Sequence, residues 1–404
     1  MQTDVAYRNL FDGTGSGPGT AYEPPSPPDF TNSFSDRVGR HTEFADETYE
    51  TADADSETGE EPSKAAVSDT LSETVLAFLT AIQEMGIETM LGTDSDDKLS
   101  GWTNSAIVAG DGDDVIKVWS DSAVDAGAGN DTIDAWSGSA IDAGAGEDTV
   151  RAWSDSYVSG GEGNDRIDIW SGSQAEGGSG DDIIHAWSET RVSGGAGNDR
   201  IDIWSDSYAD AGAGDDVINA HSNTVVSGGS GNDTIDAHCD SRVDGGSGDD
   251  TIRVGSDSVV TGGTGSDTIV AWGGSDISGG AGDDWIKVTG EGSTIRFNAG
   301  DGYDRMVLGS GGTIQLGAGL NAENVQAKVE GNVATVTFNG SDDMFEVQMV
   351  PDKPVNVVFD SGETLALEPD DAFKVAYEDA RQNVRQKLNA GEVVGYEDMK
   401  LLMI

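Results

Sequence analysis

The sequence is poor in cysteine, in basic residues and in long apolar runs. Its one cysteine, Cys239, excludes disulfides and cysteine-based metal sites within a single chain. Lys and Arg total 22 against 75 Asp and Glu, a net charge of -53, which disfavours binding to nucleic acid or anionic membranes. No apolar run approaches the length of a transmembrane helix, and the first residues lack the basic and apolar pattern of a cleavable secretion signal.

Signals for catalysis are also scarce. The sequence has four histidines, and it contains no G-x-S-x-G, H-E-x-x-H or Walker motif. Three of the histidines, His185, His221 and His238, fall at regular positions of a repeat that is described below. Cys239 takes the place of a repeat serine and has no neighbours that favour a nucleophile. We therefore expect a protein that is not an enzyme.

Glycine is abundant, with 57 residues against 9 prolines, which indicates many tight turns. The glycines belong to a repeat of 17 residues, for example G-G-E-G-N-D-R-I-D-I-W-S-G-S-Q-A-E at 160–176. Such a strict short period predicts a solenoid. Twelve copies follow one another without insertion, and they begin at Gly92, Ala109, Ala126, Ala143, Gly160, Gly177, Gly194, Ala211, Gly228, Gly245, Gly262 and Gly279.

The apolar positions of the repeat predict two short strands per copy. Position 8 is apolar in every copy, and positions 10 and 16 are mostly aliphatic. Alternation over positions 7 to 11 predicts a strand with positions 8 and 10 facing inward, and position 16 supplies the opposite wall. The predicted fold class is all-β, a right-handed parallel β-roll or β-solenoid over residues 91–311.

The segments on either side of the repeats differ from them in composition. Residues 1–67 are acidic and proline-rich and are predicted to be disordered. Residues 312–369 predict a β-rich cap, and residues 370–404 predict a helix followed by a C-terminal tail. Residues 68–90 predict a capping helix, from a Thr70–Glu73 capping box and from helical spacing of Leu71, Val75, Phe78, Leu79, Ile82 and Met85.

Position 6 of the repeat is an aspartate in every copy. Stacked carboxylates repel one another, and no column of Lys or Arg runs beside them. Glycines at positions 2 and 4 allow the loop carbonyls to point inward, which gives an all-oxygen shell suited to Ca²⁺. The alternative, that Gly and Asp only make good turns, explains a single loop better than a repeated one. The candidate metal ligands are Asp97, Asp114, Asp131, Asp148, Asp165, Asp182, Asp199, Asp216, Asp233, Asp250, Asp267, Asp284 and Asp304.

These loops resemble the G-G-x-G-x-D-x-U-x nonapeptide of the haemolysin-type calcium-binding repeats, the RTX (repeats-in-toxin) family, over roughly residues 91–310. The resemblance implies about a dozen Ca²⁺ ions between successive loops, held by the position-6 carboxylates and loop carbonyls. The second half of each copy lacks a glycine loop, so we expect calcium along one edge only. The first copy departs from the motif, with Thr93 and Ser95 in place of glycines.

The resemblance also has implications for location. Proteins of this family are typically exported unfolded by a type I secretion machinery that recognises an uncleaved C-terminal signal. The acidic and apolar tail at 398–404 resembles such a signal. We therefore expect an extracellular protein, either free or attached to a cell surface, with calcium and the secretion machinery as partners.

Position 11 of the repeat is most often tryptophan. Such a column is either a track that binds polysaccharide or an aromatic ladder that stacks on itself and stiffens the sheet, and we favour the ladder. Position 14, mostly Ser or Thr, predicts a hydrogen-bonded hydroxyl column; we favour this structural role over ice binding. The tryptophans at position 11 are Trp102, Trp119, Trp136, Trp153, Trp170, Trp187, Trp204 and Trp272.

Three classes of function are compatible with these patterns. We favour a secreted protein that folds on binding calcium and has a structural, adhesion or matrix role. The first alternative is a module that binds or helps to modify an extracellular polysaccharide or cell-surface component through its tryptophans. The second alternative is a toxin or effector of the RTX type, which needs a separate active or pore-forming part.

Overall fold

The computed structural model describes residues 89–390, 393–394 and 399–402. The predicted disordered segment 1–67 and residues 68–88 of the predicted capping helix lie outside this description. The prediction of a helix to residue 90 is wrong at its end, because residues 89 and 90 belong to strand β1 (Thr89–Leu91). Their backbone pairs in parallel with the first repeat, Thr89 with Ala106.

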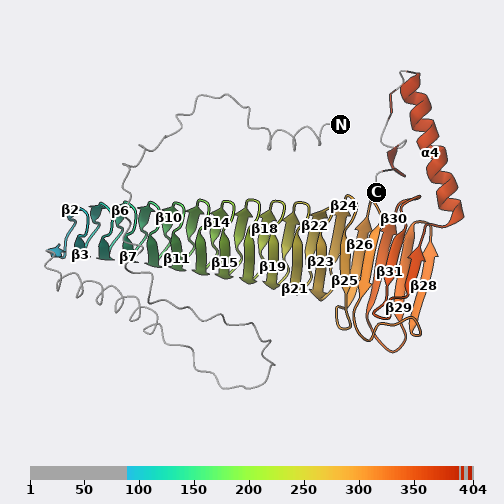
Figure 1. Ribbon diagram of the computed structural model, residues 1–404, viewed down its shortest axis with the longest axis horizontal. Coiled ribbons are helices and arrows are strands. Elements are labelled where there is room, and N and C mark those ends of the chain that lie inside the picture. Colours follow the sequence, from blue (N-terminus) through green and yellow to red (C-terminus); the bar gives the residue numbers. More distant parts are fainter. Residues whose placement is uncertain (1–88, 391–392, 395–398, 403–404) are drawn as a thin grey trace. The chain divides into compact units, whose positions relative to one another are not determined.

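The repeats form a parallel β-solenoid of about 13 turns with roughly 17 residues per turn. Each turn, or coil, contributes one strand to each of two sheets, and coils are numbered here from coil 1 at Gly92. The pairing register follows the sequence period, so that Tyr157 pairs with Gln174 and Gln174 with Arg191. Figure 1 shows the strands of the repeats, from β2 to β24, stacked side by side in chain order.

Both sheets contain 16 strands. Sheet A consists of β1, β3 (Ala106–Asp111), β5 (Ala123–Ala128), β7 (Ala140–Ala145), β9 (Tyr157–Glu162), β11 (Gln174–Ser179), β13 (Arg191–Ala196), β15 (Tyr208–Ala213), β17 (Val225–Ser230), β19 (Arg242–Ser247), β21 (Val259–Thr264), β23 (Asp276–Ala281), β25 (Thr294–Phe297), β27 (Gly312–Leu316), β31 (Val355–Val358) and β32 (Thr364–Leu367). Sheet B consists of β2 (Lys98–Gly101), β4 (Val115–Val118), β6 (Thr132–Ala135), β8 (Thr149–Ala152), β10 (Arg166–Ile169), β12 (Ile183–Ala186), β14 (Arg200–Ile203), β16 (Val217–Ala220), β18 (Thr234–Ala237), β20 (Thr251–Val254), β22 (Thr268–Trp272), β24 (Trp285–Thr289), β26 (Tyr303–Leu308), β30 (Met344–Met349), β29 (Val333–Phe338) and β28 (Val325–Glu330).

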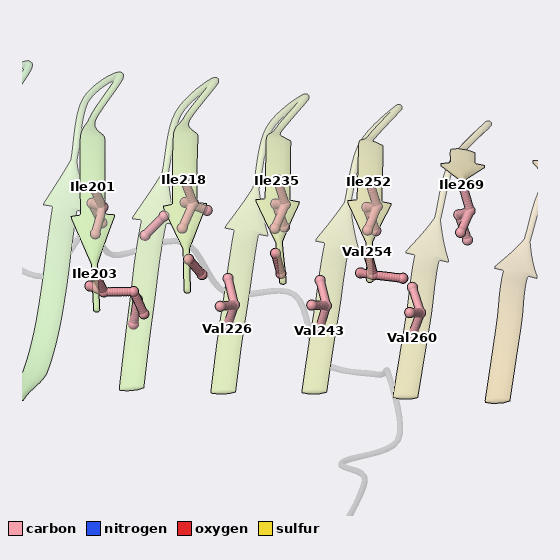
Figure 2. Packing of buried hydrophobic residues seen from close by; sticks show 14 of the residues in the cluster. Ile201, Ile203, Ile218, Val226, Ile235, Val243, Ile252, Val254, Val260 and Ile269 are labelled. Carbon is pink, nitrogen blue, oxygen red and sulfur yellow. The ribbon is translucent and has the colours of Figure 1, made fainter. Parts of the chain in front are cut away.

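The core is a narrow column of aliphatic side chains between the two sheets. Figure 2 shows Ile201, Ile218 and Ile235, at position 8 of successive coils, in one file and Val226 and Val243, at position 16, in the facing file. All five are buried. Burial of one such side chain contributes about 1.5–3 kcal/mol, so the core stabilises the stack coil by coil. The predicted inward positions are therefore confirmed.

The coils widen after the last full repeat. Trp285 pairs with Arg305, 20 residues later, where earlier coils advance by 17. A cluster of Phe297, Phe338 and Phe345, with ring centroids 5.1–6.3 Å apart, fills this wider core. The core is therefore aliphatic along the repeats and aromatic at the C-terminal end.

The region after residue 312 is only partly the set of hairpins that the sequence predicts. β30 pairs in parallel with β26, and β31 pairs in parallel with β27, so both sheets continue beyond the repeats. Antiparallel pairing of β29 and β28, and of β32, follows at the last edges. These hairpins occupy the sheet edges that would otherwise remain unpaired at this end.

The predicted C-terminal helix is present as α4 (Asp371–Asn389). The Asp370 carboxylate caps it by accepting the N–H of Phe373 at 2.8 Å. The other oxygen of Asp370 accepts the N–H of Gly331, which lies between β28 and β29, at 2.7 Å. This aspartate therefore ties the start of the helix to the last hairpin of sheet B.

Candidate metal centre

From coil 2 onward, the turn before each repeat strand of sheet B has glycines at positions 2 and 4. In coil 5, Gly161 and Gly163 have φ values of 110° and 125°, which L side chains rarely adopt. A Cβ on Gly161 would also lie 1.9 Å from the carbonyl oxygen of Gly144 in the coil before. The glycines thus let adjacent loops stack closely, and they bring the position-6 aspartates of neighbouring coils into one file.

The position-6 aspartates point into the solenoid and are buried from Asp114 to Asp304. Their Oδ1 atoms each accept the backbone N–H of the position-6 residue in the preceding coil; Asp165, for example, donates to Asp182 at 2.7 Å. This bond recurs in every gap from Asp97 to Asp304, at 2.6–3.2 Å. We call this file of residues, Asp114 to Asp304, the aspartate ladder.

The other oxygen of each ladder residue has no hydrogen-bond partner. In coil 6, Oδ2 of Asp182 and the carbonyl oxygen of Gly194 lie 2.3 and 2.4 Å from the point that a Cβ on Gly177 would occupy. Two oxygens that converge without a hydrogen between them suit a hard cation such as Ca²⁺. The buried unpaired atoms are Oδ2 of Asp114, Asp131, Asp148, Asp165, Asp182, Asp199, Asp216, Asp233, Asp250, Asp267, Asp284 and Asp304.

Burial raises the pKa values of the ladder. It raises the pKa of Asp165 to about 6 and that of Asp182 to about 7. Asp304, where the charge of Asp284 adds to burial, has a pKa of about 8. A buried carboxylate without a counter-ion disfavours its charged form, and a bound cation would remove that penalty.

The first loop differs from the others. Asp97 is only half-buried, and its Oδ2 accepts hydrogen bonds from the backbone N–H of Thr93 at 2.6 Å and from its hydroxyl at 2.9 Å. Thr93, which replaces a glycine, therefore donates hydrogen bonds to the Oδ2 atom that has no partner in the other loops. Asp97 is therefore the one predicted ligand that does not belong to the aspartate ladder.

The sequence reasoning missed a second column, at position 5, which is Asn or Asp in ten of twelve copies. Here Oδ1 accepts the N–H of the position-5 residue in the following coil; Asn198, for example, donates to Asp181 at 2.7 Å. Positions 5 and 6 thus link adjacent coils in opposite directions. The signal in the sequence was the near-constant short carboxylate or amide side chain beside the invariant aspartate.

One carboxylate per coil limits what the ladder can bind. Within the described ranges, no three His, Cys, Asp or Glu side chains converge on one point. A site in this file therefore has to combine the carboxylates of neighbouring coils with loop carbonyls. This donor set consists of oxygen alone, which fits Ca²⁺ better than zinc or copper.

The tryptophans of position 11 stack on one another. From Trp102 to Trp187, each ring lies 4.5–5.7 Å from the next, with interplanar angles of 3–16°. Trp204 stacks instead on His221 at 4.3 Å. Most ring faces are therefore covered by another ring, as in the aromatic ladder that the sequence analysis favours.

The hydroxyls of position 14 are buried and bonded to the backbone. Ser139 is 2% exposed, and its hydroxyl donates to the carbonyl of Trp136 at 3.1 Å. The backbone N–H of Ser122 donates to the same hydroxyl. A buried column of this kind closes the second turn of each coil and offers no flat hydroxyl surface to ice.

A second outward column, at position 9, is held by charge. His185 lies between Asp168, 2.8 Å from Nδ1, and Asp202, 3.3 Å from Nε2. Hydrogen bonds to these two carboxylates raise the pKa of His185 to about 9. The histidine is one rung of a charge-alternating ladder, because basic or neutral residues alternate with Asp134, Asp168 and Asp202 along position 9. His41 lies outside the described residues.

Comparison with known proteins identifies the repeat. Eight overlapping stretches match the family described as RTX calcium-binding nonapeptide repeat (4 copies). These stretches are residues 120–139, 154–173, 174–188, 191–202, 222–238, 240–258, 244–278 and 255–286. A search of curated proteins gives no match.

A solved structure is similar in part. It is the X-ray crystal structure of a hyperactive, Ca²⁺-dependent, β-helical antifreeze protein from an Antarctic bacterium. The alignment has a TM-score of 0.45 and 22% sequence identity, and it covers 56% of this chain and 85% of that one. Separately, none of the helices that the structure describes is long and apolar enough to cross a membrane.

Proposed function

Residues 120–286 are RTX haemolysin-type calcium-binding nonapeptide repeats, and from this premise we propose that the chain is a secreted structural protein whose solenoid folds when calcium occupies the aspartate ladder. The observation that carries the proposal is the file of twelve buried, unpaired carboxylate oxygens. Without a cation the folded state must keep these groups charged and unpaired, or take up protons. With Ca²⁺ the binding free energy becomes folding free energy.

The proposed ligands are the predicted aspartates of the ladder, with about one ion in each gap between loops. Each ion would contact the carboxylates of adjacent coils together with loop carbonyls such as that of Gly194. Asp97 is the weakest candidate, because Thr93 already satisfies its Oδ2. The serine edge of the solenoid has its own hydrogen bonds and needs no metal.

The proposed location is outside the cell. Extracellular modules bind Ca²⁺ with dissociation constants of about 10⁻⁴–10⁻³ M, so the chain would remain unfolded at cytosolic calcium levels and fold after export. RTX proteins are typically secreted, and the type I machinery is the partner that this route requires. A folded, strongly acidic solenoid then suits a structural, adhesion or matrix role at or near a cell surface.

The alternative functions receive less support. A polysaccharide track needs exposed ring faces, whereas the tryptophans from Trp102 to Trp187 cover one another. Trp102, 76% exposed at the end of the stack, and Trp272, 61% exposed, are the rings that would serve a glycan best. Glycan arrays test that alternative, and lysis of liposomes by the purified protein tests a toxin.

A calcium titration followed by far-UV circular dichroism tests the proposal, with Mg²⁺ as the control cation. We expect a cooperative gain of β signal in the sub-millimolar to millimolar range with Ca²⁺ and none with Mg²⁺. A full β signal in chelator would overturn the proposal, because the aliphatic core and the serine column would then suffice to fold the chain.

A further inference from the structure

The outer face of sheet A is less exposed over coils 1 to 4, where three of its side chains are buried, than at position 15 of most later coils. Position 16 lies in the core, so positions 15 and 17 point to the outer face. At these outward positions Ala106 and Ala123 are both 0% exposed, and Ser159 is 2% exposed. We call the outward positions of β3, β5, β7 and β9 the alanine face.

The same columns are open to solvent farther along the sheet. Position 15 is exposed in most coils beyond the alanine face, where it carries large side chains. Val225, for example, is 43% exposed. Position 15 is alanine in coils 1 to 3 and Tyr157 in coil 4, so the residue type changes close to where the exposure changes. The exposed residues at this position are Gln174, Arg191, Val225, Arg242 and Val259.

Ionisable groups on the alanine face report the same burial. At position 17, burial raises the pKa values of Asp125 and Asp142, the latter to about 6. Burial is also the main cause that raises the pKa of Tyr157. Burial also raises the pKa of Asp244, at position 17 of coil 9, so the exposed fractions and not the pKa values distinguish the two parts of the sheet.

The described elements that contact this face do not lie over it. β3 contacts β1, β2 and β5, and β7 contacts β5 and β9; these are neighbours in the sheet or lie across the core. β1, where the described chain begins, pairs with β3 at this end of sheet A. The residues that precede Thr89 therefore enter the chain next to the strands that carry the alanine face.

We propose that residues 68–88 form a helix that packs lengthwise on the alanine face and clamps coils 1 to 4 together. A 21-residue helix is about 30 Å long, and four coils span about 19 Å, so the segment is long enough. Its apolar positions, which include Val75, Leu79 and Ile82, form one stripe. Small alanines let a helix approach the sheet closely, while the large residues of later coils would hold it away.

Thiol labelling of the full-length, calcium-loaded protein tests this inference. The background is Cys239→Ser, because serine is the usual residue at position 12. Single cysteines are placed at Ala123→Cys and, as the matched position-15 control, at Val225→Cys. We expect iodoacetamide to label residue 123 at least about tenfold more slowly than residue 225.

A second substitution identifies what covers the face. Leu79→Asp, on the apolar stripe, should raise the labelling rate at residue 123 towards that at 225, while Thr80→Asp, on the opposite side of the helix, should leave it unchanged. Equal rates at 123 and 225 in the starting protein would show that the face is open. Protection that survives Leu79→Asp would assign the cover to another segment and overturn the proposal. Both readings are made in calcium, so they do not depend on whether calcium drives folding.

Discussion

At the scale of single residues, each ladder aspartate has two oxygens with different roles. Oδ1 of Asp182 accepts a backbone N–H, which asparagine could also do, whereas its Oδ2 is buried and unpaired. The charge therefore opposes folding without metal and favours it with metal. Invariance at this position is better explained by a bound cation than by the turn alone, because asparagine would serve the turn equally well.

Asp182→Asn should have opposite effects in the two conditions. In chelator the substitution removes a buried unpaired charge. It should therefore raise the free energy of unfolding of any folded solenoid by about 1–3 kcal/mol. In calcium it should raise the midpoint of folding several-fold and lower the number of bound ions by one or two. Calorimetric calcium titration and circular dichroism measure both effects.

The matched control is Asp181→Asn at position 5. Asparagine already occupies that position in coils 5 and 7, as Asn164 and Asn198, where it makes the same inter-coil hydrogen bond. Asp181→Asn should therefore leave both the midpoint and the ion count unchanged. An equal shift in the two variants would mean that calcium binding depends on net charge and has no particular need of the ladder.

His185 gives the solenoid a pH dependence that does not arise from the aspartate ladder. Its pKa is raised from an ordinary 6.5 to about 9, so its contribution to stability is complete below about pH 6.5 and is lost as the pH rises through 9. The wild type should thus lose roughly 1 kcal/mol relative to His185→Asn between these limits. Urea unfolding at pH 6.5 and 9.5 measures the difference.

His221→Asn is the control for this measurement. Burial, followed by the charge of His238, lowers the pKa of His221, the opposite direction from His185. The wild type should therefore not lose stability relative to His221→Asn as the pH rises. A pH-independent difference for His185→Asn as well would contradict the charge ladder of position 9.

The aspartate column could be predicted from the sequence, but its bonding could not. An invariant acidic residue within a strict period implies a stack of carboxylates in any solenoid. Which oxygen accepts which N–H depends on how adjacent loops are offset, and the period does not fix that offset. The same holds for position 5, whose Oδ1 atoms link coils in the opposite direction from those of position 6.

At the scale of elements, the two sheets follow from the repeat because every strand pairs with its own counterpart one period later. The prediction weakens where the period ends. β30 pairs in parallel with β26, although Met344 lies 41 residues after its partner Tyr303. No local sequence pattern specifies a pairing partner so far away in the chain. The sequence therefore predicted ordinary hairpins for these strands.

The tryptophan ladder should stabilise sheet B through its stacked pairs. Trp153 stacks on Trp136 at 5.4 Å and on Trp170 at 4.5 Å. Trp153→Thr, a residue found at this position as Thr289, removes both contacts and should cost about 1–3 kcal/mol. Urea unfolding in saturating calcium measures the loss.

Trp272→Thr is the comparison for the stacked ring. Trp272 is 61% exposed, and both neighbouring coils place a small residue at its position, Gly255 and Thr289. We expect its substitution to cost less than half as much. If the two variants lose the same stability, hydrophobic area rather than stacking accounts for the ladder. Binding of a glycan that is lost with Trp272→Thr alone would support the polysaccharide alternative.

At the scale of the whole molecule, stability adds up along one dimension. Each coil contacts the coil before it and the coil after it, so the core, the serine column and the aspartate ladder all grow by equal steps. The net charge of -53 opposes this growth at every step. If calcium binds the aspartate ladder as proposed, its effect on stability should scale with the number of coils.

Deletion of two whole coils tests this additivity. Removal of residues 194–227 takes out 34 residues, two periods, and joins Ser193 to Gly228 in register. His185 then faces Asp236, so the charge alternation of position 9 is kept. We expect the shortened chain to fold in calcium with about two fewer bound ions, because Asp199 and Asp216 are gone.

Deletion of 194–226 is the out-of-register control. It leaves one extra residue and shifts the following strand by one position, which turns its core side chains outward. That variant should lose the calcium-induced β signal of the coils around the junction. If both deletions behave alike, the 17-residue period does not set the register, and the stacked ladder on which the calcium proposal depends would have to be abandoned.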